Sequence, residues 1–231
     1  MIKTVISKLL PSHLRELFIS YGIRNFLEYC YYKNFVKRYF IFNTKKLKYF
    51  FHLYNTTWKN ERAIEIPIVL SYLYLYNPKE VIEVGNVLSH YIKIEHTVVD
   101  KYEKAENVCN VDIINFKADR KYKLLISIST LEHIGYDEEE KKFTKAKNAF
   151  IKFTELVEKG GTILVTFPVG YNPFLDNFVK NREINFTKIF YYKRISKTNW
   201  ILCDENEIWE QKYNFPFPAG NGLIVGVKEL I

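Results

Sequence analysis

Short apolar runs alternate with longer amphipathic stretches along the middle of this chain. Four of the runs have the length and composition of buried strands: Val81–Val84, Thr97–Val99, Leu124–Ser129 and Thr162–Phe167. The longest amphipathic stretch predicts a helix over Asp137–Lys159, with acidic residues at its start and two glycines after its last lysine. Alternating strands and helices indicate βαβ units, and hence a parallel sheet that is covered on both faces.

The flanking regions predict a helix before this sheet and an antiparallel edge after it. The helix is expected over Glu61–Tyr76, with Pro67 inside it, and Asn77-Pro78 marks the turn into the first strand. Near the C-terminus, Lys188–Ile195 and Leu223–Val227 have the composition of strands and predict the antiparallel edge.

Residues 1–58 have a different character, because aromatic and basic residues are interleaved there. Helices are predicted over Ser12–Ser20 and Ile23–Phe40, separated by Gly22, a natural helix stop. We therefore divide the chain into a helical N-terminal extension, 1–58, and an α/β domain, 59–231.

The composition narrows the class of protein. The chain has 231 residues, of which 48% are hydrophobic, enough for the core of one α/β domain. It has neither an apolar stretch long enough to span a membrane nor the pattern of a signal peptide at its start. The three widely spaced cysteines argue against a disulfide framework and a cysteine zinc site, and they predict a cytoplasmic location. The net charge of +8 favours an anionic partner, with a solvated basic surface as the alternative.

Polar residues stand at the C-terminal ends of the predicted strands, where parallel sheets bind nucleotide cofactors. The first strand ends in Glu83, Val84 and Gly85, and a glycine there lets the backbone approach a ligand closely. The second strand ends in Asp100, where a carboxylate accepts hydrogen bonds from ribose hydroxyls. A helix cap is the alternative role for Asp100.

The most informative motif is Ser129-Thr130-Leu131-Glu132-His133, which directly follows an apolar strand. Together with Gly160-Gly161 before the next strand, these motifs resemble, in the same order, those of class I S-adenosylmethionine-dependent methyltransferases. That family usually carries a second glycine two residues after the first, and Val87 stands there instead.

A narrower group of bacterial and archaeal methyltransferase-like proteins is similar over about residues 56–226, and valine is normal at this position in that group. The similarity is carried by four segments: Glu61–Pro67, Gly85–Tyr91, Ser129–His133 and Pro168–Pro173.

The resemblance implies a Rossmann-like, doubly wound, mostly parallel sheet with an antiparallel C-terminal edge, and S-adenosyl-L-methionine as the cofactor. It implies that Asp112 accepts the amino N–H of adenine while Ile113 flanks the ring; a plain loop aspartate is the alternative. The residues that it places at the cofactor are Glu83, Gly85, Asn86, Asp100, Asp112, Ile113, Ser129 and Thr130.

Methyl transfer to a hydroxyl needs a group that takes the proton of the acceptor. His133 and Glu132 stand at the expected mouth of the cleft, and His90 is a third candidate. Two adjacent residues make a poor metal pair without further ligands, so we predict no metal.

The residues expected at the substrate lie before the first strand and after the fifth. They are Glu61, Arg62, Tyr171 and Asn172. A surface ion-pair face is the alternative role for Glu61, Arg62 and Glu65, because Glu61 and Glu65 stand four residues apart and such residues lie side by side on a helix.

Three functions fit these patterns. The first is O-methylation of a small-molecule, sugar or lipid-linked glycan hydroxyl. The second is methylation of RNA, although the Asn/Asp-Pro-Pro-Tyr/Phe motif of many base methylases is missing after strand four. The third is a catalytically inactive methyltransferase-like binding protein. The extension is expected to cap the acceptor site, to contact an anionic membrane peripherally, or to pack on the domain.

Overall fold

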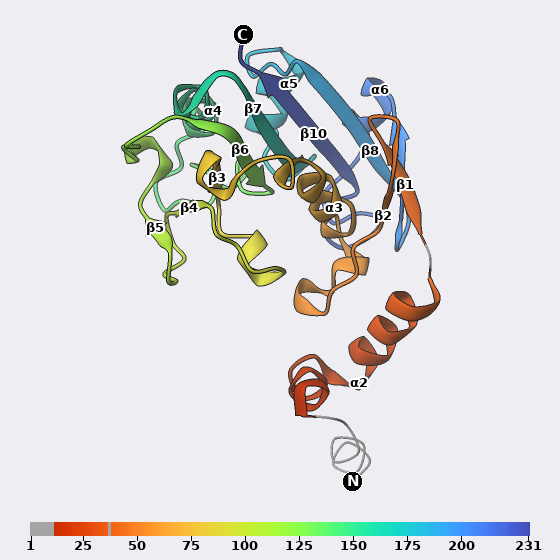
Figure 1. Cartoon of the computed structure of the whole chain (residues 1–231). Helices are drawn as coiled ribbons and strands as arrows, with labels where there is room; N and C mark the ends of the chain where they lie inside the picture. The colour runs from red at the N-terminus through yellow and green to blue at the C-terminus, as the bar shows by residue number, and fades with distance from the viewer. Residues whose placement is uncertain (1–11, 37) are drawn as a thin grey trace.

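An eight-stranded sheet forms the centre of the molecule in this computed structural model, which describes residues 12–36 and 38–231. The order across the sheet is β5-β4-β3-β6-β7-β10-β8-β9, and the first five strands in this order are parallel (Figure 1). The last three run antiparallel to their neighbours and form one edge. The strands are β3 (Val81–Val84), β4 (Thr97–Asp100), β5 (Val108–Asn110), β6 (Tyr122–Ile128), β7 (Val157–Pro168), β8 (Lys188–Ser196), β9 (Asn199–Cys203) and β10 (Gly222–Glu229). The predicted fold class is confirmed.

The apolar runs become strands because both faces of the sheet are buried. Neighbouring residues of β6 point to opposite sides, so that Leu124 and Ile126 enter one core and Leu125 the other. Helix α3 (Arg62–Leu73) covers one face, and α4 (Lys145–Leu156), α5 (Pro173–Lys180) and α6 (Glu205–Trp209) cover the other. This arrangement fixes the carboxyl ends of the parallel strands at one edge of the domain.

The crossovers on one side of the sheet are unusually short. A single turn, η3 (Leu88–His90), lies between β3 and β4, and η4 (Ile113–Asn115) lies between β5 and β6. Two further turns, η1 (Tyr54–Lys59) and η2 (Pro78–Glu80), precede the sheet. The chain winds from β3 to β5 in one direction and from β6 to β7 in the other, so the winding reverses between β3 and β6. Such a switch point is where open α/β sheets bind ligands.

The helix predicted over Asp137–Lys159 is wrong at both ends. It begins at Lys145 because the acidic side chains at 137 and 138 bind neighbouring groups instead of starting a helix. It ends at Leu156, since residues 157–161 already belong to β7. The helix expected over Glu61–Tyr76 is shorter by a few residues and contains Pro67, as predicted.

The N-terminal extension is only partly helical, which corrects the prediction. Helix α2 (Ser12–Phe35) is interrupted at Gly22, as predicted, where φ is 74°. The helix does not continue to Phe40, because β1 (Tyr39–Phe42) turns back through Asn43 and pairs with β2 (Lys45–Lys48). This hairpin forms because its alternate side chains, Phe40 and Phe42, are buried against the main domain.

Candidate functional site

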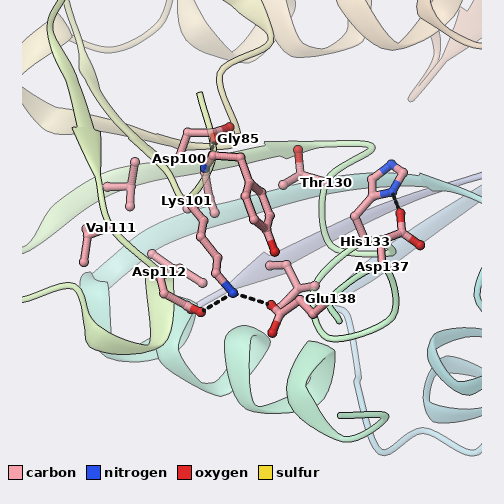
Figure 2. Close-up of a pocket in the computed structure, with 14 residues that line it drawn as sticks. Gly85, Asp100, Lys101, Val111, Asp112, Thr130, His133, Asp137 and Glu138 are labelled. Carbon is pink, nitrogen blue, oxygen red and sulfur yellow. Dashed lines mark hydrogen bonds and ion pairs between the residues drawn. The ribbon is translucent and has the colours of Figure 1, made fainter. Parts of the chain in front are cut away.

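A cavity of about 270 Å³ opens at the switch point (Figure 2). One wall is apolar and consists of Val99, Val111, Ile113 and Ile134. Acidic side chains also line the cavity: Asp100 ends β4, Asp112 follows β5, and Asp137 and Glu138 lie between β6 and α4. An apolar cavity with a few polar groups at its rim suits a small organic ligand.

Gly85 brings the end of β3 close to the end of β6. Its φ of 89° is a conformation that side chains disfavour, and a Cβ there would lie 2.1 Å from Oγ1 of Thr130. Both residues line the cavity. Glycine is required at this strand end because the loop after β3 and the loop after β6 approach each other closely here.

Asp100 lies at the end of β4 and faces the cavity, where it was predicted to stand. Its Oδ2 accepts a hydrogen bond from the backbone N–H of Asn86 at 2.9 Å, and Oδ1 accepts from Tyr102 and Glu103. The carboxylate thus ties the loop after β3 to the loop after β4. Carboxylate oxygens have further lone pairs, so these contacts leave capacity for ribose hydroxyls.

Asp112 belongs to a network of two acids and two lysines at the far rim of the cavity. Lys101 lies between Asp112 and Glu138, at 3.3 and 3.1 Å, as Figure 2 shows. Lys145 contacts the same two carboxylates at 2.5 Å. Partial burial opposes ionisation, but the ammonium of Lys145 outweighs it and lowers the pKa of Asp112. An adenine bound by Asp112, as predicted, would share this carboxylate with Lys101 and Lys145.

A second cavity, of about 240 Å³, continues from the first past Gly85 and Thr130. Arg62 lines it, and so does Asn86, which is buried and whose Oδ1 has no hydrogen-bond partner among the described residues. His90 also lines this second cavity; its ring stacks on Tyr54 at 4.5 Å. The first cavity thus leads to a polar chamber with one guanidinium and an unsatisfied amide oxygen.

Behind this chamber, three carboxyl groups surround Arg62. Glu65 pairs with the guanidinium and accepts the hydroxyl hydrogen of Ser129 at 2.7 Å, and Glu61 accepts the N–H of Gly220 at 3.0 Å. Glu132 is 1% exposed, and its Oε2 lacks a hydrogen-bond partner within the described chain. Burial raises the pKa of Glu132 well above its usual range. Glu61, Arg62 and Glu65 are thus mainly buried, so the alternative of a surface ion-pair face is wrong.

His133 stands at the mouth of the first cavity and is held from two sides. Its Nδ1 lies 2.5 Å from Oδ2 of Asp137, and the same oxygen accepts the hydroxyl hydrogen of Tyr171 at 2.6 Å. The rings of His133 and Tyr171 meet edge to face at 4.7 Å. Burial works against ionisation of Asp137, but the hydrogen bonds from Tyr171 and His133 prevail and lower its pKa.

An ionised Asp137 only accepts hydrogen bonds, so in the neutral imidazole of His133 the proton is on Nδ1 and Nε2 is the acceptor. The nearest acid on the other side, Glu132, has its Oε1 3.7 Å from Nε2, beyond hydrogen-bond distance. Nε2 is therefore available to take a proton from a bound molecule.

Six of the predicted site residues line neither cavity; they are Glu61, Glu83, Ser129, Glu132, Tyr171 and Asn172. Three of these hold neighbouring loops in place. Glu83 is fully buried: one oxygen binds Nε2 of His96 at 2.8 Å and the other binds backbone N–H groups of the loop after β3. Asn172 caps α5 and donates to the carbonyl of Glu132 at 2.8 Å. Ser129, with a φ of 37°, holds Glu65. These contacts fix the loops that carry the cavity residues.

Sequence reasoning missed several residues of this site. Lys101, Glu138 and Lys145 form the charged rim, and Asp137 was taken as a helix start. A usable signal for Asp137 is its spacing of four residues after His133, since such residues meet on one side of a helical turn.

Comparisons with known proteins add the following. No family model and no curated protein matches the sequence. Among solved structures, the N-methyltransferase NodS from Bradyrhizobium japonicum, in complex with S-adenosyl-L-homocysteine, is 10% identical with a TM-score of 0.46 and covers 74% of this chain and 87% of its own. An rRNA methylase from Streptococcus thermophilus is 11% identical, with a TM-score of 0.43 and coverages of 72% and 97%. A sugar N-methyltransferase, KedS8, from a Streptoalloteichus species is 12% identical, with a TM-score of 0.38 and coverages of 72% and 87%.

The strand order and the motifs at the strand ends give the class of fold directly. The mostly parallel sheet with its antiparallel edge is the Rossmann-like methyltransferase fold that the sequence motifs imply. The motif residues Gly85, Asp100, Asp112 and Thr130, which are far apart in the sequence, line one cavity.

Proposed function

We propose that this chain is an S-adenosylmethionine-dependent methyltransferase that transfers a methyl group to a hydroxyl of a small molecule or glycan. The observation that carries the proposal is the cleft at the switch point, which leads from an apolar slot to the His133–Asp137 pair. A Rossmann-like binding protein without activity would not need an imidazole held in this orientation.

The residues present fit the cofactor. The apolar wall and Asp100 suit the adenosine part, with Asp112 at the far end of the slot. In the second cavity, Arg62 suits a carboxylate, and the unsatisfied Oδ1 of Asn86 suits an ammonium. When bound, the cofactor supplies an electrophilic methyl group on a sulfonium centre.

The chain contributes position and proton transfer. As the acceptor oxygen forms its bond to the methyl carbon and the carbon–sulfur bond breaks, Nε2 of His133 takes the hydroxyl proton. Asp137 stabilises the imidazolium that results, since its carboxylate stays hydrogen-bonded to Nδ1. Tyr171 keeps that carboxylate in place through the second hydrogen bond to the same oxygen.

Calorimetry with S-adenosyl-L-homocysteine tests the first half of the proposal. Micromolar affinity, about −7 to −8 kcal/mol, is expected for a site of this kind. No heat of binding at millimolar cofactor would refute it. Transfer of a labelled methyl group to pools of glycans and small hydroxyl compounds tests the second half, and labelling restricted to amine acceptors would contradict the hydroxyl assignment.

A further inference from the structure

One face of α2 exposes large apolar side chains. Leu27, Tyr31 and Phe35 follow each other at intervals of four residues and are 60%, 57% and 78% exposed. The opposite face of the helix packs on η1, where Phe26 and Tyr32 belong to a small core around Trp58. The helix therefore buries one face and presents a second apolar face to the outside; Figure 1 shows α2 projecting away from the sheet.

The hairpin repeats this arrangement. Tyr39 and Ile41 point outward and are 47% and 48% exposed. Across the ladder they face Lys48 and Lys46, which share their side of the hairpin because directly paired residues do. The ammonium of Lys46 lies 4.7 Å above the ring of Tyr39. This face therefore mixes apolar and basic groups.

The charge of the protein is concentrated in the same segment. Residues 1–58 contain ten Lys and Arg against two Asp and Glu, whereas residues 59–231 contain 24 of each. The whole excess of +8 thus belongs to the extension, and the α/β domain is balanced. Within the part of the chain that the structure describes, Lys45, Lys46 and Lys48 form no ion pair, so their charges are available to an anionic partner.

We propose that the exposed apolar face of α2 and the outer face of the β1–β2 hairpin dock on an anionic lipid bilayer. Lysines would contact the headgroups while the aromatic and aliphatic side chains enter the interface, a combination that binds anionic membranes. No helix in the described residues is long and apolar enough to cross a bilayer. The aliphatic side chains favour a bilayer over RNA, because Leu27 and Ile41 cannot stack on bases. This docking goes beyond the proposed function and does not depend on it.

Flotation of the full-length protein with vesicles tests the proposal. Binding is expected with vesicles of 70% phosphatidylcholine and 30% phosphatidylserine, weak binding with phosphatidylcholine alone, and release by about 0.5 M salt. Replacing Lys45, Lys46 and Lys48 together by Gln should lower the partition coefficient about 100-fold, at about fivefold for each lysine near the surface.

A matched control removes the same charge from the α/β domain. Lys79, Lys117 and Lys159 are exposed and form no ion pair within the described chain, and their replacement by Gln should leave binding unchanged. Equal loss of binding in both triple variants would overturn the proposal, because net charge alone would then explain the attraction.

The apolar contribution is tested with Leu27→Ser and Ile41→Ser. Each should weaken vesicle binding about tenfold, while Tyr74→Ser, at a 73% exposed position outside the extension, should not. Circular dichroism confirms that the variants remain folded. Absence of vesicle binding, or micromolar binding to single-stranded RNA that the lysine variant abolishes and the two aliphatic variants leave intact, would overturn the proposal in favour of a free or RNA-binding surface.

Discussion

The imidazole of His133 and the carboxylate of Asp137 are joined by a contact of 2.5 Å between Nδ1 and Oδ2. The two residues are four positions apart along the chain, and both line the first cavity. Because Asp137 fixes which ring nitrogen carries the proton, the pair gives His133 a defined direction for proton transfer.

Replacing His133 by Ala is therefore expected to lower turnover of a hydroxyl acceptor by about 10²–10⁴-fold. Cofactor affinity should change little, since the base acts on the acceptor. Glu132→Gln is the matched variant at the neighbouring acid, and it should retain activity. Labelled methyl transfer and calorimetry, done on the same preparations, give the two quantities. Full turnover in the His133 variant would remove this residue from the mechanism.

Asp100→Asn should weaken binding of S-adenosyl-L-homocysteine by about 2 kcal/mol, because charge-assisted hydrogen bonds to the ribose become neutral ones. Asparagine has a single carbonyl oxygen and replaces only one of the two carboxylate oxygens that accept backbone N–H groups, so thermal melts of the variant check that the loops remain in place. Asp119→Asn, an exposed position away from the cavity, serves as the control in calorimetry. Unchanged affinity in the Asp100 variant would show that this carboxylate only holds the loops together.

Arg62→Lys tests whether Arg62 binds the carboxylate of the cofactor, as distinct from its adenosine part. The substitution keeps the positive charge beside Glu65 but loses the two-pronged geometry of the guanidinium. Affinity for S-adenosyl-L-homocysteine should fall about tenfold, while affinity for adenosine, which has no carboxylate, should be unaffected. Competition binding with both ligands measures the difference, and an equal loss for both would show that Arg62 acts through the fold.

Gly85→Ala should destabilise the protein by about 3 kcal/mol, because the methyl group would overlap Thr130 and the backbone conformation disfavours a side chain. Thr130→Ala removes Oγ1 and Cγ2, the two atoms that would lie nearest to the new methyl group, and leaves the Cβ of residue 130 in place. The double variant should thus recover part of the stability, which urea unfolding of the four proteins in a double-mutant cycle would measure. Strict additivity would mean that the two loops do not approach as described.

Asp176 predicts a pH dependence of stability. Burial raises the pKa of Asp176 to about 7, although the N–H of Gly170 donates to its Oδ2. The folded state therefore binds the proton more tightly than the unfolded state, and this contribution to stability is lost as the pH rises from about 4 to about 7. Asp176→Asn should be more stable than the parent protein above pH 7, by about 1 kcal/mol or more, and equal to it near pH 4. Thermal melts across this range would show a constant difference between the two proteins if the carboxyl ionises in the folded protein as it does in the unfolded chain, and that result would contradict the prediction.

The sequence by itself determined the parallel half of the fold. Strands β3, β4 and β6 were predicted to within two residues of their ends, and β7 was predicted correctly only near its C-terminal end. Strands buried on both faces are continuous apolar runs, so they can be found without knowledge of their neighbours. The positions of Gly85 and Asp100 at the cleft followed as well, since parallel strands bring their carboxyl ends to one edge.

Tertiary structure decided what depends on partners far along the chain. The aromatic stretch after α2 suits a helix by composition, but Phe42 packs on Phe190 and Tyr192 donates to the carbonyl of Ile41, so a hairpin forms there. The acid at 137 suits a helix start, but it is bound by His133 and Tyr171. Local patterns carry the periodicity of buried elements, whereas the roles of charged and aromatic side chains are set by whichever groups the folded chain brings within a few ångströms of them.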